Sequence, residues 1–106
     1  MNAGYINLRG HQVQSYEWPN VGEPVLLMHG GLSQTSHFDQ SVLPAVEDKF
    51  HIFGYDRTGH GYTGDREGSM HFDFQYQEAV AYLEDVVKEP AHLIGHSDGA
   101  IISLMV

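Results

Sequence analysis

Apolar residues in the first half of the chain follow two different patterns. Residues 4–18 alternate loosely between apolar and polar positions around Gly10, which predicts a β-hairpin that turns near this glycine. Residues 19–24 contain the turn-forming residue types of a loop. Residues 25–28 are continuously apolar, which is typical of a strand covered on both faces in a parallel sheet. A further strand is predicted at residues 50–55.

Apolar residues at longer spacings predict helices between these strands. One helix is expected within residues 37–48, and an amphipathic helix is expected from Asp73 to Lys88, with Asp73 as its N-cap and Pro90 ending it. Residues 92–94 form a short apolar strand, and a helical pattern follows it. Strands that alternate with helices imply right-handed crossovers and a mostly parallel sheet. The predicted class is therefore α/β, with an N-terminal hairpin followed by βαβαβα.

The most specific chemical pattern follows the last strand, where Gly95-His96-Ser97-Asp98-Gly99 has the form Gly-x-Ser-x-Gly. Gly95 and Gly99 lack the Cβ atoms that would collide in a turn sharp enough to lift a serine hydroxyl clear of its neighbours. A helix starting near Asp98 points its free N–H groups and positive dipole end toward charge that develops beside Ser97. The pattern indicates a nucleophilic Ser97, and the alternative is a glycine-rich turn that carries a passive serine.

Two more motifs follow predicted strands. His29-Gly30-Gly31 ends the apolar run at residues 25–28, and residues 56–61 read Asp-Arg-Thr-Gly-His-Gly after the strand at residues 50–55. A glycine at such a position lets a backbone N–H approach a substrate oxygen, and donors fixed in advance stabilise the oxyanion of acyl transfer. Together with the serine motif, these residues make the chain resemble the α/β-hydrolase-fold family. The resemblance extends over essentially all of residues 1–106, but onto only the N-terminal half of that family's domain.

The resemblance implies roles for named residues. It assigns the two oxyanion donors to the backbone N–H groups of Gly31 and Asp98, with Leu32 as the alternative for the first donor. The side chain of Asp98 is given no catalytic role. His29 is expected to hold its loop by hydrogen bonds, and His96 is expected to line the pocket or to pack beneath it.

The expected site also includes supporting glycines and two catalytic residues that come later in the family's sequence order. Gly30, Gly95 and Gly99 are expected to support the turn and the loop, and the Asp56-Arg57 pair is expected to be structural. In this family the nucleophile precedes the acid and the histidine, so the resemblance places both of those residues beyond Val106. The expectation is therefore a partial α/β-hydrolase fold whose C-terminal half is missing. Made alone, such a chain is expected to be inactive and to fold poorly.

Composition narrows the classes of partner. The chain has 106 residues, no cysteine, five Lys plus Arg and a net charge of −9, which argues against binding to a nucleic acid backbone. No basic start followed by an apolar segment is present in the first thirty residues, and no apolar run is long enough to span a bilayer. A cytoplasmic protein without a membrane partner is therefore expected. The compartment cannot be inferred from redox chemistry.

Metal and nucleotide sites are not expected. None of the eight histidines are paired at i, i+4 spacing on a predicted helix, so no metal is predicted. Residues 59–64 match Gly-x-Gly-x-x-Gly, but this match follows the later strand at residues 50–55 and leads into a loop. A dinucleotide fingerprint requires glycines that open a helix directly after the first strand. No cofactor is predicted.

The resulting hypothesis is a serine hydrolase that acts on a small molecule with an ester-like or other carbonyl group, through an acyl-enzyme at Ser97. An acyltransferase or a cofactor-free perhydrolase on the same fold would use the same serine. A binding protein of this fold, in which Ser97 is not activated, is the non-enzymatic alternative. The substrate and the oligomeric state are left open.

Overall fold

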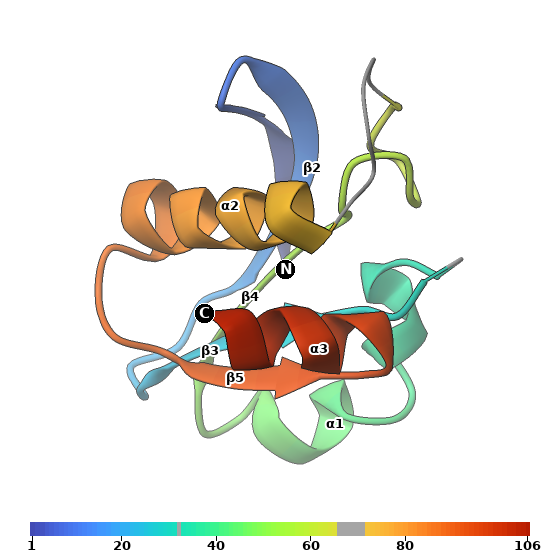
Figure 1. Cartoon of the computed structure of the whole chain (residues 1–106). Coiled ribbons are helices and arrows are strands. Elements are labelled where there is room, and N and C mark those ends of the chain that lie inside the picture. Colours follow the sequence, from blue (N-terminus) through green and yellow to red (C-terminus); the bar gives the residue numbers. More distant parts are fainter. Residues whose placement is uncertain (32, 66–71) are drawn as a thin grey trace.

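The fold is centred on a single sheet that collects all of the strands in the described part of the chain. The computed structural model describes residues 1–31, 33–65 and 72–106, and five strands pair in the order β1-β2-β4-β3-β5. Figure 1 shows the sheet with α2 and α3 lying over it. The strands are β1 (Asn2–Leu8), β2 (His11–Trp18), β3 (Pro24–Met28), β4 (His51–Tyr55) and β5 (His92–Gly95).

The predicted hairpin and the predicted parallel core are both confirmed. β1 and β2 are antiparallel, and the turn between them places Arg9 and Gly10 at positive φ values of 55° and 82°. Glycine adopts this left-handed region without steric cost, which explains its place in the turn. β2 joins β4 in the antiparallel sense, whereas β3 is parallel to both β4 and β5. The hairpin therefore extends a parallel core by two antiparallel strands.

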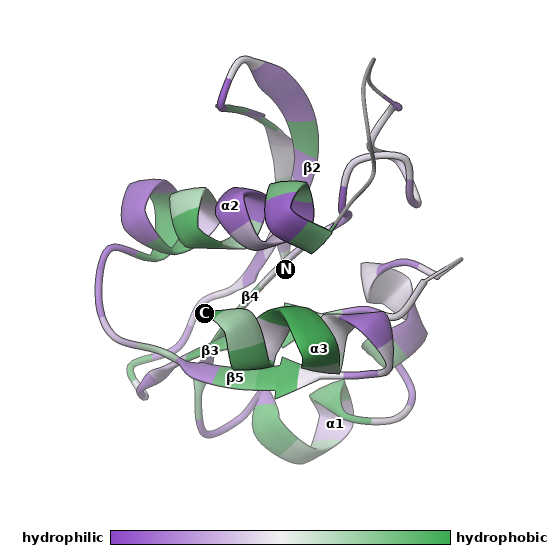
Figure 2. Cartoon of the chain, in the orientation of Figure 1, coloured by the Kyte–Doolittle hydropathy of each residue, from purple (hydrophilic) through white to green (hydrophobic). Residues whose placement is uncertain are grey.

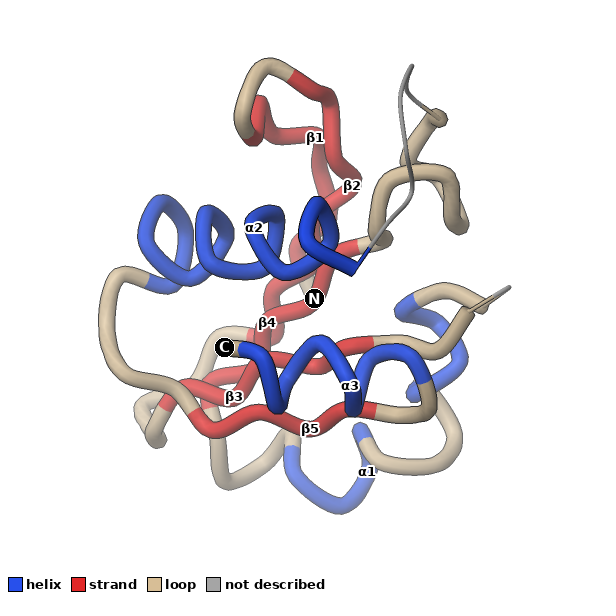
Figure 3. The backbone as a smooth tube through the Cα atoms, in the orientation of Figure 1, coloured by secondary structure: helices blue, strands red, loops and turns tan. Residues whose placement is uncertain are grey.

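Helices cover both faces of the sheet. The helical segments are η1 (a 3₁₀ turn, Thr35–Phe38), α1 (Leu43–Val46), α2 (Phe72–Tyr82), η2 (a π turn, Leu83–Val87) and α3 (Asp98–Met105). On one face, Leu26 and Met28 of β3 pack in one cluster with Tyr82 of α2 and Ile102 of α3. On the other face, alternate residues of β3 pack with residues of η1 and α1. Figure 3 traces this arrangement along the backbone.

The helical predictions need three corrections. A helix does lie within residues 37–48, but it is only the four-residue α1, whose first turn contains Pro44, and the turn η1 precedes it. Asp73 is not an N-cap, because α2 already begins at Phe72 and Asp73 lies in its first turn. The helix expected to reach Lys88 changes at Leu83 into the π turn η2, which Lys88 ends with a left-handed φ of 64°.

An apolar surface remains at the edge formed by β5 and α3. Leu104 is 89% exposed, and Ile101, Met105 and Val106 are also exposed. β5 is an edge strand that pairs only with β3 among the described strands. In Figure 2 the hydrophobic colouring extends along β5 and much of α3. An edge strand beside exposed apolar side chains favours association.

No helix in the described residues is long and apolar enough to cross a membrane.

We expect the 106-residue chain, made alone, to self-associate through this edge. Leu104→Lys places a charge on the apolar surface and should shift the chain toward monomer. Val21→Lys is the matched control, because Val21 is 103% exposed on a loop outside this surface. Sedimentation velocity measures both variants. A monomeric parent chain, or an equal effect of the two substitutions, would contradict the expectation.

Candidate active site

The Gly-x-Ser-x-Gly motif forms the turn between β5 and α3. β5 ends at Gly95, α3 begins at Asp98, and Ser97 between them is exposed. Ser97 has φ 54° and ψ −117°, a conformation that is costly for a residue with a Cβ atom. The turn is closed by the N–H groups of Gly99 and Ala100, which donate to the carbonyl oxygens of His96 and Ser97 at 2.9 Å each. This strained strand-to-helix turn is the geometry that exposes a serine nucleophile.

The two glycines of the motif allow the backbone to pack this tightly. A Cβ atom on Gly99 would lie 2.0 Å from the carbonyl oxygen of Met28, so α3 packs directly against the end of β3. A Cβ atom on Gly95 would lie 2.6 Å from the carbonyl oxygen of Gly99. Both distances are far inside van der Waals contact with backbone atoms, which cannot move aside cheaply. The support expected of Gly95 and Gly99 therefore has a steric basis.

The loop after β3 lies against this turn. A Cβ atom on Gly30 would be 3.3 Å from the Cβ atom of Ser97, and one on Gly31 would be 2.3 Å from Oδ2 of Asp98. Within the described residues, neither the Gly31 N–H nor the Asp98 N–H donates a hydrogen bond. The structure thus brings the two expected oxyanion donors into neighbouring segments. Leu32, the alternative donor, lies outside the described residues.

His29 is a neutral histidine that links two loops by hydrogen bonds. The side chain is fully buried, and its Nε2 accepts the N–H of Arg57 at 3.0 Å. Its Nδ1 lies 2.7 Å from the carbonyl oxygen of Gly30, which can only accept, so Nδ1 carries the proton. Burial lowers the pKa of His29 to about 4. Both ring nitrogens are occupied, so this histidine holds the loop and is not available as a base for Ser97.

Asp56 ties the loop after β4 to the loop after β3. Its Oδ1 accepts the N–H of Thr35 at 2.9 Å, and its Oδ2 accepts the N–H of Tyr62 at 3.1 Å and the hydroxyl of Tyr16 at 2.9 Å. The side chain is fully buried. One carboxylate therefore fixes three segments of the chain, as the structural reading of this residue predicted.

Arg57 is a buried cation behind the same loops. It is 1% exposed, its Nη1 donates to Oε1 of Gln75 at 2.9 Å, and its Nε and Nη2 make no hydrogen bond within the described residues. Burial lowers its pKa, while the nearby charges of Asp98 and Glu78 act in the opposite direction. Glu78 itself accepts the N–H and the hydroxyl of Thr58 at 3.1 and 2.5 Å. These contacts attach the loop after β4 to α2.

Sequence reasoning missed Gln75 and Glu78. Both are buried polar residues on α2, where the pattern of apolar residues indicated only a core-facing helix. Their spacing of three places them on one helical face. A glutamate and a glutamine on a buried helix face must have polar partners. Their presence in the sequence could therefore have predicted buried hydrogen bonds to this helix.

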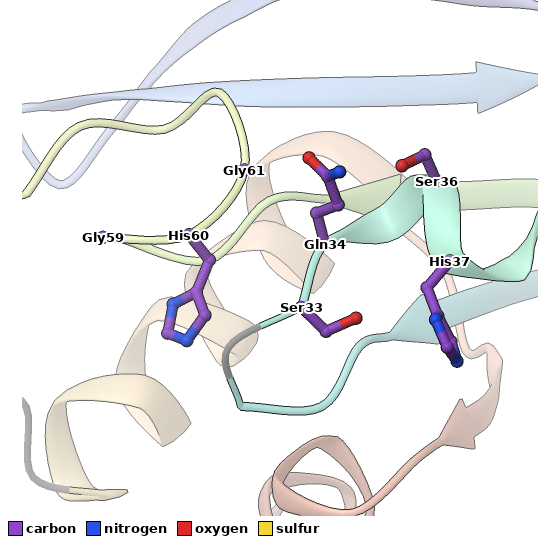
Figure 4. Close-up of a pocket in the computed structure, with 7 residues that line it drawn as sticks. All are labelled: Ser33, Gln34, Ser36, His37, Gly59, His60 and Gly61. Carbon is purple, nitrogen blue, oxygen red and sulfur yellow. The ribbon is translucent and has the colours of Figure 1, made fainter.

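A polar hollow adjoins the turn that carries Ser97. Its volume is about 530 Å³, and it is lined by residues 33, 34, 36 and 37 after β3 and residues 59–61 after β4 (Figure 4). The rings of His37 and His96 lie 5.5 Å apart between centroids, which connects the hollow to the residue before Ser97. His96 is exposed and is not among the residues that line this hollow.

The alternative ligand sites find little support in the described residues. No three acidic or histidine side chains among them come together as a metal-binding group. The glycine-rich segment 59–64 folds back on itself, because the N–H of Gly59 donates to the carbonyl oxygen of Gly64 at 3.0 Å. It therefore closes a turn and does not open a helix as a dinucleotide fingerprint does.

We expect His29 to make folding stability depend on pH in the complete domain. The folded state protonates His29 only near pH 4, against an ordinary pKa of 6.5, so the unfolded state binds more protons between these values. The free energy of unfolding therefore falls as the pH drops from 6.5 to 4, by up to about 3 kcal/mol from this group. His29→Gln should flatten that slope in urea titrations at several pH values. An unchanged slope would contradict the assignment of a neutral His29.

Comparison with known proteins agrees with this geometry. The alpha/beta hydrolase family model matches residues 25–106. The uncharacterized protein YqjL of Bacillus subtilis is 30% identical over 79 residues, which cover 74% of this chain and 31% of that protein. Epoxide hydrolase A of Mycobacterium tuberculosis is 26% identical over 100 residues, covering 92% of this chain and 31% of that enzyme.

A solved structure gives the same result for the fold. The crystal structure of N-formylmaleamic acid deformylase from Pseudomonas putida S16 superposes with a TM-score of 0.86 at 21% identity, over 98% of this chain and 40% of that one. The chain spans about a third of the length of the curated relatives that it matches. From its central strand β3 through the serine turn to α3, the chain belongs to the alpha/beta hydrolase family.

Proposed function

We propose that this chain carries the nucleophile and the oxyanion hole of a serine hydrolase. The observation that supports this most is the strained backbone of Ser97, with the Gly30-Gly31 loop packed against it. Holding an exposed serine in a strained conformation costs stability, and such strain is concentrated at functional sites. The relatives named above include an epoxide hydrolase and a deformylase, which supports hydrolysis as the reaction class.

In the proposed reaction, Oγ of Ser97 attacks the carbonyl carbon of an ester-like substrate and loses its proton to a base. The carbonyl oxygen becomes an oxyanion, which accepts hydrogen bonds from the N–H groups of Gly31 and Asp98. Collapse of this intermediate expels the alcohol and leaves an acyl group on Ser97. Water then attacks the acyl group and releases the acid, which restores the serine.

The surrounding charges favour this assignment. The N-terminus of α3 begins at Asp98 and directs its positive dipole end toward the oxyanion. Arg57 adds a buried positive charge behind the loops, which offsets the carboxylate of Asp98. That carboxylate lies beside Gly31, and the proposal uses only the backbone N–H of Asp98.

The base and its orienting acid are proposed to lie after this chain. His29 uses both ring nitrogens in hydrogen bonds to the protein, and His96 directly precedes the nucleophile. In the family order, the acid and the histidine follow the serine. The relatives are about three times as long as the matched region, which leaves room for both residues.

Ser97→Ala, in a protein that carries this chain within the complete hydrolase domain, should lower turnover by about 10⁴-fold or more, because the covalent nucleophile is lost. Ser103→Ala is the control: Ser103 lies on the same helix and bonds the carbonyl oxygen of Gly99. Activity on 4-nitrophenyl esters and labelling by a fluorophosphonate probe measure the effect. Near-normal turnover, or labelling that persists without Ser97, would exclude the proposed mechanism.

Gly31→Pro deletes one proposed oxyanion donor and should raise the barrier by about 2.7–4 kcal/mol. Gly31→Ala is the matched control, since it retains the N–H and adds only a Cβ atom that meets the mobile end of Asp98. Turnover of the alanine variant should therefore fall much less. If both variants fold and lose turnover equally, the loss comes from steric crowding, and another N–H group is the donor.

A further inference from the structure

The hollow beside the serine turn has a distinctive chemical character. Its lining joins two loops that end neighbouring parallel strands, β3 and β4. Figure 4 shows Ser33, His37 and His60 pointing to one side, whereas Gln34 and Ser36 point to the other. The first group shares the side on which His37 approaches His96 of the serine turn. These three side chains therefore share the side of the hollow on which His37 lies near the serine turn.

No described side chain that lines the hollow carries a fixed charge. The serines, the glutamine and the two histidines each offer a hydrogen-bond donor and an acceptor. Asp56 lies nearby, but three hydrogen bonds to Thr35, Tyr62 and Tyr16 occupy its oxygens. A ligand in the hollow therefore meets neutral groups of mixed hydrogen-bonding character.

The hydrogen bond of His60 to the protein fixes which of its ring nitrogens can accept a hydrogen bond from a ligand. Its Nδ1 lies 3.1 Å from the carbonyl oxygen of Thr58, which can only accept, so Nδ1 donates there. Nε2 of the neutral ring is left as an acceptor. The ring also packs against His29, with 5.1 Å between centroids, which holds it in place. His60 thus presents a positioned acceptor, while the hydroxyl of Ser33 is directed toward the end of the hollow that holds His37 (Figure 4).

We infer that this hollow binds a neutral, hydroxyl-bearing part of the substrate, an inference that rests on the proposed function at Ser97. A substrate hydroxyl can donate to Nε2 of His60, and other polar groups of the substrate can bond the serine hydroxyls of the lining. An apolar group would strip water from these polar side chains without replacing its hydrogen bonds. An anionic group would find no fixed positive charge in the described lining, in a chain of net charge −9.

The inference predicts a preference among matched esters in the complete domain. 4-Nitrophenyl 3-hydroxybutyrate should exceed 4-nitrophenyl butyrate in kcat/KM by about tenfold, mainly through KM, and 4-nitrophenyl hemisuccinate should be the poorest. Butyl and 2-hydroxyethyl esters of one acid test the alcohol side of the bond in the same way. At least one of the two series should show the preference, and its absence from both would overturn the inference.

Substitution of His60 tests the residue assignment. His60→Phe retains an aromatic ring and removes both nitrogens, so it should lower the ratio of kcat/KM between the 3-hydroxybutyrate and butyrate esters from about tenfold to about one. His92→Phe is the control, because His92 begins β5 at the end remote from Ser97. A preference that survives His60→Phe, or falls equally in His92→Phe, would contradict the assignment.

A binding measurement separates this inference from the catalytic proposal. In the complete domain with Ser97→Ala, 3-hydroxybutyramide should bind about tenfold more tightly than butyramide and should shift the ring resonances of His37 and His60 in NMR spectra. Neither amide requires catalysis. If no ester is cleaved by the parent protein but this binding is seen, the catalytic proposal fails and the inference stands. Equal binding of the two amides, or tighter binding of succinamate, would overturn it.

Discussion

The contact between α3 and the end of β3 determines where every other part of the site can lie. The carbonyl oxygen of Met28 occupies the space that a side chain on Gly99 would need. Because the helix can approach this closely, Ser97 emerges beside the loop that follows β3, and the N–H groups of Gly31 and Asp98 come into neighbouring segments. A single methyl group at position 99 would push the helix away from the sheet and separate Ser97 from its proposed donor Gly31.

A second layer of contacts fixes the loops without using regular secondary structure. His29 and Asp56 are both fully buried, and each connects the loop after β3 with the loop after β4. Buried polar groups are costly unless they are hydrogen-bonded, so each of these two side chains is stable in its place only when both loops are formed. The hydrogen bonds of His29 also select one tautomer. Rigid loops suit a site in which donors must be positioned before charge develops.

Short-range patterns predicted most of the architecture. The hairpin turn at Gly10, the buried strand at residues 25–28 and the turn at residues 95–99 were recognisable, because each depends on a few adjacent residues with strong steric preferences. Helix boundaries were less accurate, since Pro44 and a π turn shorten the expected segments.

Long-range pairings in the site were not readable from one sequence. The role of Glu78 depends on its contact with Thr58, which lies twenty residues away, and nothing local identifies that partner. His60 and Ser33 likewise line one hollow only because the ends of β3 and β4 are adjacent in the sheet. The family of the chain and the position of its serine could therefore be predicted, whereas the chemistry of the adjoining hollow required the fold.

The parallel pairing of β3 with β5 also has a kinetic consequence. These strands are neighbours in the sheet but lie far apart along the chain, with β4 and α2 between them in sequence. Closing so long a loop costs chain entropy before any contact compensates for it, so such pairings form slowly. The left-handed backbone of Ser97 can be held only after this closure. Ser97 therefore takes this conformation only after β3 and β5 have paired, when the loops after β3 and β4 have already been synthesised.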